Sequence, residues 1–440
     1  MNIPAPLTSF SIGAAVLLTL AVALAACSDT GSNEGSTPVA VSQTAQAAAS
    51  AGDTLATGPV TGAATGNSAI ATSASAGGSG VTDDEVLFGQ SAALSGPALE
   101  LGSNMRLGIE AAFHEVNEQG GVNGRILKLV SLDDAYEPEA AITNTLKLIE
   151  EEGVFALIGE VGTPTSRSAT PIAADAGVPF IAPFTGAEFL RDDDWDNIVN
   201  LRASYYQETE EMVERLTQDL GITSIGVLYQ DDSYGRAGYR GVRQALDRRG
   251  MEPVSIGLYP RNTKAVRAAL LDLNRGDPEA VIMIGAYEPV AALVELARFT
   301  GTSPVFLTVS FVGSNALANE LGTDGAGVYV TQVVPFPTDS SLPIVSAYLQ
   351  ALSAYDRFSD PGFVSLEGYL AGRLAIEGLQ RCGRDVDRAC FLDILNSTDG
   401  IDIEGFPLRF GDDNQGSDQV FITVIGEDGE YHPVTTLSDN

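Results

Sequence analysis

The stretch from Ala156 to Leu190 constrains the fold of this chain more than any other. Two short apolar runs, Ala156–Ile158 and Val178–Ile181, each stop at a loop of small, hydroxyl-rich residues, and the Ala-rich segment Ser166–Ala176 between them can form a helix. A strand, a polar loop, a helix and a second strand in this order are typical of parallel βαβ winding. The sequence therefore predicts an α/β fold built on doubly wound parallel sheets.

The two loops of this stretch are the first candidates for a binding site. In open α/β sheets, ligands collect in the crevice beyond the carboxyl ends of the strands. Thr163 and Thr165 also precede a helix, so their hydroxyls and the free N–H groups of the helix start would suit a carboxylate. We therefore expect one pocket to be faced by six residues: Thr163, Pro164, Thr165, Phe184, Thr185 and Gly186.

The strand and helix alternation begins at Glu85 and starts again at Tyr206, which predicts two lobes. A chain of 440 residues is also long for a single compact core. Three late helical segments have too little strand around them for a third lobe, so we expect them to return and cover the first. The predicted boundaries are 83–204 for lobe 1, 205–335 for lobe 2, 336–417 for the return to lobe 1, and 418–440 for the return to lobe 2 and the tail.

Some details of the late chain are also predicted. Val328–Val334 is predicted to be an apolar strand, and the Pro335-Phe336-Pro337 that ends it favours a crossing rather than a new core element. The three helical segments are Ile344–Ala354, Leu366–Gln380 and Cys390–Leu395. Two strands are expected after them, at Leu408–Phe410 and Val420–Ile425.

Two tyrosines of the second lobe are further candidates. Tyr234 and Tyr287 lie in loops after predicted strands, where a ring can close over a ligand while its hydroxyl stays paired. Each alone is more often a surface or core tyrosine. Their common position after strand ends favours the cleft.

The composition excludes several classes of function. With 24 basic and 58 acidic residues, the net charge of −34 repels nucleic acid and anionic membrane surfaces. His114 and His432 are the only histidines in the sequence, so it has almost no residues from which a histidine triad or a zinc site could be built. Acidic pairs such as Asp133-Asp134 and Asp231-Asp232 favour turns and helix caps, although a hydrolase that uses carboxylates alone remains an alternative. We expect no catalytic residues, cofactor or metal.

The N-terminus predicts export. Residues Ile12–Ala26 are apolar over a length that suits a signal peptide, and Leu24-Ala25-Ala26-Cys27 resembles the lipobox of bacterial lipoproteins. That resemblance implies a signal peptide at 1–26 and a lipid on Cys27. Residues 27–82 are rich in Ala, Gly, Ser and Thr, which predicts a flexible tether to a membrane outside the cytoplasm. In such an oxidising compartment, Cys382 and Cys390 would form a disulfide, with two buried thiols as the alternative.

From about Asp84 to Tyr431 the chain resembles the periplasmic solute-binding proteins of branched-chain and hydrophobic amino-acid ABC importers, which have the type I periplasmic-binding fold. The resemblance depends on the order and spacing of several short motifs: Ser95-Gly96-Pro97, Glu118-Gln119-Gly120-Gly121-Val122-Asn123-Gly124, Asp133-Asp134 with Pro138, Ile158-Gly159, Ala182-Pro183 and Ser233-Tyr234-Gly235. The family implies two lobes joined by three crossings, with a ligand held between them by hinge closure. It also implies delivery of the ligand to a membrane permease.

The resemblance places individual residues in the site. Thr163 occupies the position of the family's serine that holds the ligand carboxylate, and Thr185 and Gly186 fall in the next contacting loop. Tyr234 and Tyr287 match positions where aromatic residues line the cleft.

Two features depart from the family pattern. Amino-acid binders have an acid after the strand predicted at Val305–Thr308, and this chain has Ser310 and Phe311 there. Either Glu160 or Glu367 takes that role, or the ligand is not an α-amino acid. Tyr136 and Gly162 occupy the places of a disulfide that some members carry.

The function expected from the sequence is an extracytoplasmic solute-binding component of an ABC importer, with no enzymatic activity. Its ligand would be a branched-chain or hydrophobic amino acid, or a related small amide or carboxylate. Its partners would be the permease and ATPase, and we expect a monomer anchored by lipid. A receptor that senses the same ligand for a signalling partner is the first alternative, and the carboxylate hydrolase is the second.

Overall fold

The structure is a computed structural model that describes residues 80–192, 194–397, 399–410 and 413–437. The predicted signal peptide, Cys27 and almost all of the predicted tether lie outside the described residues. Within the described residues, no helix is both long and apolar enough to cross a membrane.

The first sheet has five parallel strands in the order β2-β1-β3-β4-β5. Short apolar runs such as Ala156–Ile158 are buried on both faces, as expected for strands of a parallel sheet with helices on each side. The strands are β1 (Glu85–Ala92), β2 (Ile126–Asp133), β3 (Ala156–Ile158), β4 (Phe180–Ile181) and β5 (Ile198–Val199).

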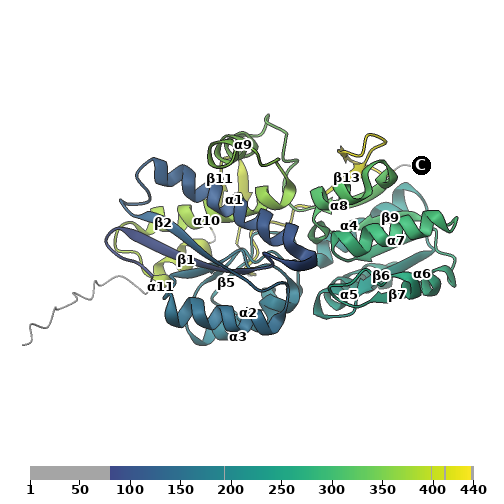
Figure 1. Cartoon of the computed structure of the whole chain (residues 1–440), viewed down its shortest axis with the longest axis horizontal. Helices are drawn as coiled ribbons and strands as arrows, with labels where there is room; N and C mark the ends of the chain where they lie inside the picture. The colour runs from purple at the N-terminus through teal and green to yellow at the C-terminus, as the bar shows by residue number, and fades with distance from the viewer. Residues whose placement is uncertain (1–79, 193, 398, 411–412, 438–440) are drawn as a thin grey trace, which may run out of the picture. The chain divides into compact units, whose positions relative to one another are not determined.

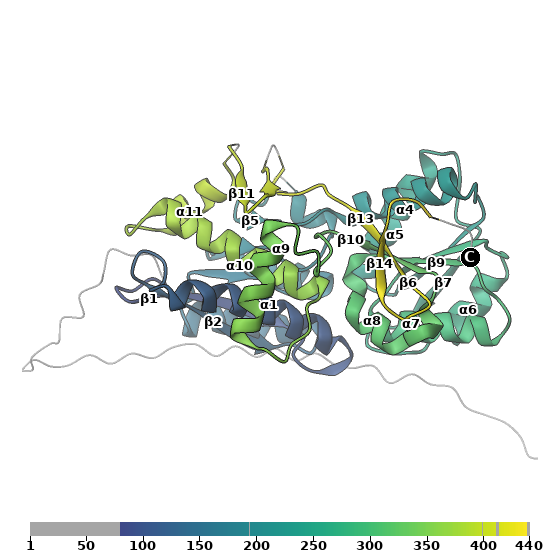
Figure 2. The same cartoon turned by 90° about the horizontal axis from the view of Figure 1, so that it is seen from above.

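Helices cover both faces of this sheet (Figure 1). On one face, α1 (Leu99–Glu118) packs along α10 (Phe363–Cys382), with α9 (Pro343–Tyr355) beside them (Figure 2). On the other face, α2 (Pro138–Leu146) packs against α3 (Thr163–Asp175). We call this sheet and its helices, together with α11 (Arg388–Leu395), the first half.

The second sheet has seven strands in the order β14-β13-β10-β9-β8-β6-β7. Five of them are parallel, and β13 and β14 add an antiparallel pair at one edge. The strands are β6 (Ile225–Gln230), β7 (Ser255–Tyr259), β8 (Ala280–Ile284), β9 (Val305–Thr308), β10 (Val328–Gln332), β13 (Phe421–Ile425) and β14 (Tyr431–Val434). This sheet and the helices that cover it form the second half.

In the second half, α4 (Tyr205–Asp219) packs against α5 (Ser233–Asp247) on one face of the sheet. The other face is covered by α6 (Arg267–Asn274), α7 (Tyr287–Phe299) and α8 (Ser314–Leu321). Short turns complete the two halves: η1 (Gly96–Ala98), η2 (Lys147–Glu151), η3 (Glu188–Arg191), η4 (Ser310–Val312) and η5 (Gly322–Gly325).

Two predictions about the late chain are wrong. Val328–Gln332 is a core strand and not only a crossing, because it is buried throughout and pairs with β9 on one side and β13 on the other. The strand predicted at Leu408–Phe410 lies two residues earlier, as β12 (Phe406–Leu408), which forms a hairpin with β11 (Ile401–Ile403).

The chain passes between the halves more than once. It enters the second half at α4, returns to the first after β10, and enters the second again at β13 (Figure 2). Cys382 and Cys390, at the end of α10 and in α11, are joined by a disulfide with a Cα–Cα distance of 6.0 Å.

Candidate functional site

Both halves wind their first five strands in the same order, 2-1-3-4-5, so each has a switch point between its first and third strands. Ligands of doubly wound proteins bind at such points, beyond the carboxyl ends of the strands. Thr163 begins the helix that follows β3 in the first half. Tyr234 and Tyr287 lie in the first turns of the helices that follow β6 and β8 in the second half.

Hydroxyl groups connect Thr163 to the boundary between the halves. The Oγ1 atoms of Thr163 and Thr185 are 2.6 Å apart, and Thr185 Oγ1 lies 3.2 Å from the hydroxyl of Tyr205. All three residues are buried. The predicted loops after β3 and β4 therefore meet, and Tyr205 of α4 joins them.

Aromatic rings continue the site across the boundary. Phe311, which follows β9, lies with its ring centroid 5.3 Å from Phe184, 6.1 Å from Tyr136 and 4.6 Å from Tyr234. Tyr234 is also 5.5 Å from Tyr205. These five rings form the interlobe aromatic cluster, which brings Phe184 and Tyr136 of the first half against Phe311, Tyr234 and Tyr205 of the second.

The start of α3 is open to a ligand. The helix has no side-chain cap, and Pro164 supplies no N–H, so the amides of Thr163 and Thr165 lack intrahelical partners. Gly162 precedes them with a φ of 106°, and a Cβ there would lie 2.2 Å from the ring of Tyr136. A glycine is therefore required where this loop passes Tyr136.

Other predicted residues have different surroundings. The hydroxyl of Thr165 donates to the carbonyl of Val161 at 2.6 Å, so it is turned back toward its own loop. Gly186 packs tightly on Tyr205, since a Cβ there would lie 2.7 Å from that ring. Tyr287 lies on another part of the boundary, where it interacts with the backbone of Glu100 in α1; burial raises its pKa to about 12.

Ser310 belongs to a buried charged cluster beside the aromatic rings. Its amide donates to Glu208 at 2.8 Å, and its hydroxyl contacts both Glu208 and Arg202. Arg202 lies 2.9 Å from Glu208, 3.5 Å from Glu367 and 5.3 Å from the ring of Phe184. Ser310 thus helps to hold the ion pair of Arg202 and Glu208 in place. As a serine, it provides no carboxylate for a ligand ammonium.

The two acids proposed for an ammonium differ in their surroundings. Glu367 faces Arg202; burial raises its pKa to about 7, and Arg202 partly offsets that rise. Glu160 follows β3, is 2% exposed, and has no hydrogen-bond partner for either carboxylate oxygen within the described residues. Burial raises the pKa of Glu160 well above its ordinary value, and Asp134 adds to the effect. Glu160 is therefore the carboxyl group that still lacks a cation.

The acidic pairs Asp133-Asp134 and Asp231-Asp232, which the hydrolase alternative would need, make hydrogen bonds and an ion pair within turns and at a helix start. Asp133 accepts the amides of Leu94 and Ala135, and Asp134 accepts the hydroxyl of Ser91. Asp232 caps α5, while Asp231 pairs with an arginine of that helix. The described residues also contain no group of three His, Cys, Asp or Glu arranged to hold a metal ion.

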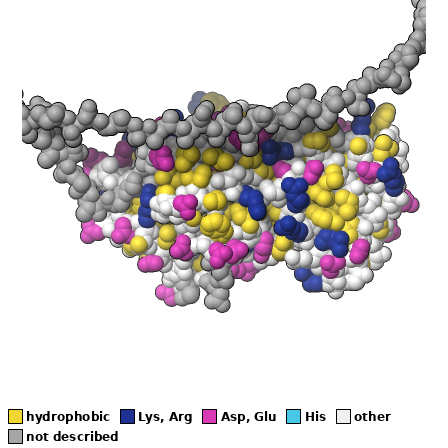
Figure 3. All heavy atoms as spheres, turned by 90° about the horizontal axis from the view of Figure 1, so that it is seen from below, with side chains coloured by type: hydrophobic (Ala, Val, Ile, Leu, Met, Phe, Trp, Pro, Cys, Tyr) yellow, Lys and Arg dark blue, Asp and Glu magenta, His cyan; other side chains and the backbone are white. Residues whose placement is uncertain are grey.

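A cavity of about 270 Å³ lies where the predicted site reaches the surface between the halves. Thr163 lines it together with residues of α3, η3, α4 and α5: Arg167, Glu188, Phe189, Tyr206, Ser233, Arg236, Ala237 and Arg240. Figure 3 views the side of the molecule on which α3 and α5 lie, and several Lys and Arg side chains gather there.

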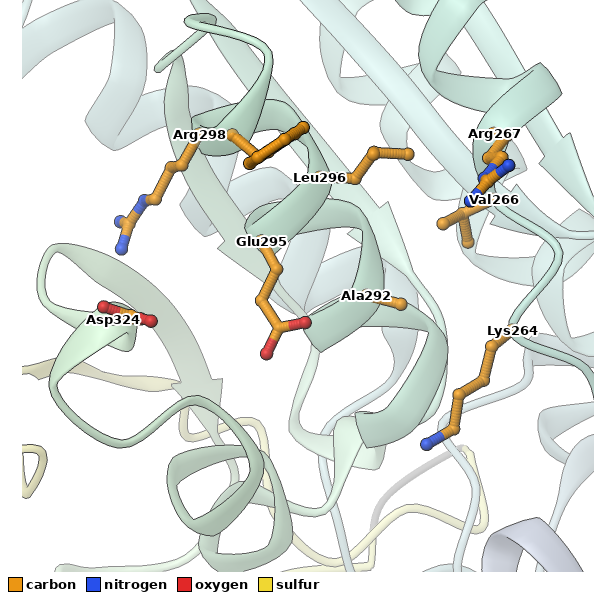
Figure 4. A pocket seen from close by; sticks show the side chains of 9 residues that line it. Lys264, Val266, Arg267, Ala292, Glu295, Leu296, Arg298 and Asp324 are labelled. Atoms are coloured by element: carbon orange, nitrogen blue, oxygen red, sulfur yellow. The ribbon is translucent and has the colours of Figure 1, made fainter. Parts of the chain in front are cut away.

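A larger cavity of about 610 Å³ lies in the second half, between α6 and α7. Figure 4 shows Arg298 and Asp324 on one side of it and Lys264 and Arg267 on the other. It contains none of the predicted site residues, and all of its lining comes from one half. Closure between the halves would not change it, so we do not assign the ligand to it.

Sequence reasoning missed Tyr205 and Arg202 as members of the site. Arg202 lies in the segment between β5 and α4, which has no periodic pattern to place it in either half, and Tyr205 is the first residue of α4 directly after that segment. The available signal was Ser204 with Gln207, a capping box that fixes the start of α4 immediately before Tyr205. For Tyr136, the sequence indicates only that it stands where some members of the resembled family have a disulfide cysteine.

Comparisons with known proteins give a consistent result. Residues 85–430 match the family described as periplasmic binding protein. The Leu/Ile/Val-binding protein homolog 7 of Brucella abortus is 25% identical over 390 residues, covering 84% of this chain and 96% of the relative.

Solved structures agree with that match. The crystal structure of a possible leucine/isoleucine/valine-binding protein from Rhodopirellula baltica is 41% identical, with a TM-score of 0.77, and covers 80% of this chain and 96% of that chain. A substrate-binding periplasmic protein from Ralstonia solanacearum is 28% identical, with a TM-score of 0.75, and covers 79% of this chain and 99% of that chain.

Proposed function

The chain belongs to the periplasmic binding protein family, and on that premise we propose that it captures a small carboxylate-bearing solute between its two halves for an ABC importer. The family consists of extracytoplasmic solute-binding proteins and not of enzymes. The single observation that carries the proposal is the meeting of Thr163 and Thr185 at 2.6 Å, beside an uncapped helix start and against rings from the other half.

The carboxylate of the ligand would bind at the start of α3. The free amides of Thr163 and Thr165 are donors, and the helix dipole favours negative charge at this end. The hydroxyls of Thr163 and Thr185 can donate to the same group once their mutual hydrogen bond is exchanged for the ligand.

An ammonium group on the ligand would pair with Glu160. A carboxylate that is buried without a partner is costly, and a cation beside it relieves that cost. Glu367 is less suited, because Arg202 already faces it. Relatives named for leucine, isoleucine and valine make these amino acids the first ligands to test.

The anchor and the partner are part of the same proposal. The apolar segment that ends at Cys27 supports a lipid anchor, and the length to residue 82 supports a tether. A tethered monomer could then deliver its ligand to a permease and its ATPase in the same membrane.

The test is calorimetric titration of purified protein with leucine, isoleucine, valine and a panel of small amides and carboxylates. Thr163→Ala should weaken binding by about 1–3 kcal/mol, because a ligand oxygen loses its donor. Ser168→Ala in the same helix is the matched control, since its hydroxyl bonds only to the backbone of α3. An unchanged affinity in Thr163→Ala, with a ligand that binds the wild type, would remove this site from the proposal.

A further inference from the structure

The 270 Å³ cavity beside Thr163 has walls from both halves. Arg167 of α3 and Glu188 and Phe189 of η3 come from the first half, while Arg236 and Arg240 of α5 come from the second. Because Thr163 is part of the lining, the cavity opens directly from the place where we put the ligand carboxylate. A ligand held there can extend into it.

The cavity concentrates positive charge in an acidic protein. The sequence has 24 basic against 58 acidic residues, yet this cavity holds three arginines and one acid, Glu188. The guanidinium of Arg167 lies 5.3 Å from the ring centroid of Phe189. Within the described residues, neither Arg167 nor Arg240 makes a hydrogen bond or an ion pair, whereas Arg236 pairs with Asp231 at 3.0 Å.

These two arginines come from opposite halves and carry the same charge. Both arginines are exposed, so water can serve their N–H groups, but two like charges at one cavity still repel, and an anion between them would offset that repulsion. Arginine presents its N–H groups in a fork that matches a carboxylate in two-point contact. The anion would therefore favour the arrangement in which the halves are together.

We propose that the ligand is a small dicarboxylate, with its second carboxylate bound by Arg167 and Arg240 in this cavity. The inference depends on the proposed function, which supplies the first carboxylate at Thr163. A cavity of this size accommodates one short acidic arm and not a nucleotide or a large sugar. An acidic amino acid would satisfy Thr163, Glu160 and the arginine cavity at once, and a plain dicarboxylate would use Thr163 and the arginines.

The test compares probes that carry two carboxylates with probes of similar size that carry one. Glutamate, aspartate, glutarate, succinate and adipate are titrated into the purified protein beside glutamine, asparagine, leucine and valine. The variants are Arg167→Gln, Arg240→Gln and the double change. Arg243→Gln is the control, because Arg243 is on the same helix but outside the cavity, near Asp247 and Glu252.

We expect at least one probe with two carboxylates to bind more tightly than its counterpart with one. The double change should weaken that binding more than tenfold and reduce its dependence on salt, and Arg243→Gln should leave both unchanged. The affinity for a probe with one carboxylate, where measurable, should respond to Thr163→Ala but not to the arginine variants.

The two proposals fail in different ways. Binding of leucine or valine that depends on Thr163 but not on the arginines, with no dicarboxylate probe bound, overturns the dicarboxylate proposal and leaves the proposed function in place. Equal affinity of the wild type and the double variant for a dicarboxylate probe also overturns it. Binding of a dicarboxylate probe that is insensitive to Thr163→Ala contradicts the shared carboxylate site itself.

Discussion

Glu160 is the residue whose surroundings depart furthest from an ordinary carboxylate. Burial raises its pKa, and the nearby Asp134 raises it further. In the unfolded chain a glutamate has a pKa of about 4.3, so the folded protein holds a proton that the unfolded chain has already released. Folding stability supplied by this group is therefore present below that value and falls as the pH rises toward the raised pKa.

Replacement of this carboxyl by an amide should remove that loss. Glu160→Gln is expected to leave stability nearly unchanged at pH 4.5 and to raise it by about 1 kcal/mol or more at pH 7.5, measured by urea unfolding without ligand. Glu118→Gln, at the exposed end of α1, is the control and should change neither value. Glu367 also titrates in this range, so part of the difference should remain; a wild-type difference between the two pH values that is no smaller in Glu160→Gln would contradict this account.

The same variant should act on binding in the opposite direction. If Glu160 pairs with a ligand ammonium, then Glu160→Gln weakens the binding of an amino acid more than it weakens the binding of the corresponding acid that lacks the amino group. Calorimetric titration with glutamate and glutarate makes this comparison within one protein. Equal losses for both probes would exclude an ammonium contact.

At the scale of elements, the crossing of α1 and α10 depends on two glycines. A Cβ at Gly108 would lie 1.9 Å from the carbonyl oxygen of Ser365, and one at Gly368 would lie 2.3 Å from that of Met105. The two helix backbones are therefore in direct contact, which no side chain larger than hydrogen permits at these positions.

Gly108→Ala should force the helices apart. We expect a loss of about 1–3 kcal/mol in the free energy of unfolding, despite the higher helix propensity of alanine. Ser103→Ala, on the partly exposed side of α1, should change it by less than about 0.5 kcal/mol. Thermal and urea unfolding of both variants make the comparison, and equal stability would show that the crossing relaxes at little cost.

Elements with a clear period were predictable from the sequence, and connecting segments were not. The apolar runs at Ala156–Ile158 and Val305–Thr308 are strands as predicted, because both faces of a parallel sheet are covered. The prolines that follow β10 led to the prediction of a crossing, although β10 itself is a buried core strand. In the candidate site, the loops after strands could be named from the sequence, whereas Arg202 and Tyr205 could not, since their placement depends on contacts with Glu367 and Tyr234 far along the chain.

At the scale of the whole molecule, the halves are also joined by a polar contact at the surface. Glu137, which precedes α2, pairs with Arg261 of the second half at 2.5 Å and accepts Asn262 at 2.8 Å. Both side chains of the ion pair are partly exposed, so it contributes at most about 1 kcal/mol. Because the contact joins the two halves, we expect it to stabilise the closed arrangement proposed for ligand capture by no more than that amount.

Glu137→Gln should therefore weaken the affinity for a bound probe by a small factor, about two- to fivefold, through a lower population of the closed state. The melting temperature without ligand should change little. Glu139→Gln, on the exposed side of α2, is the control. Small-angle scattering with and without the tightest-binding probe would detect the altered balance, and unchanged affinity and scattering would show that this contact does not influence closure.

The late return of the chain to α1 also bears on the order in which the protein can form. During synthesis α1 is made long before α10, so the side of α1 that packs on α10 has no cover until most of the chain exists. A ribosome-bound nascent chain would display that side to other molecules, and a truncated product would keep it exposed permanently. A polypeptide that crosses a membrane unfolded, and then collapses with its full length available, avoids this hazard.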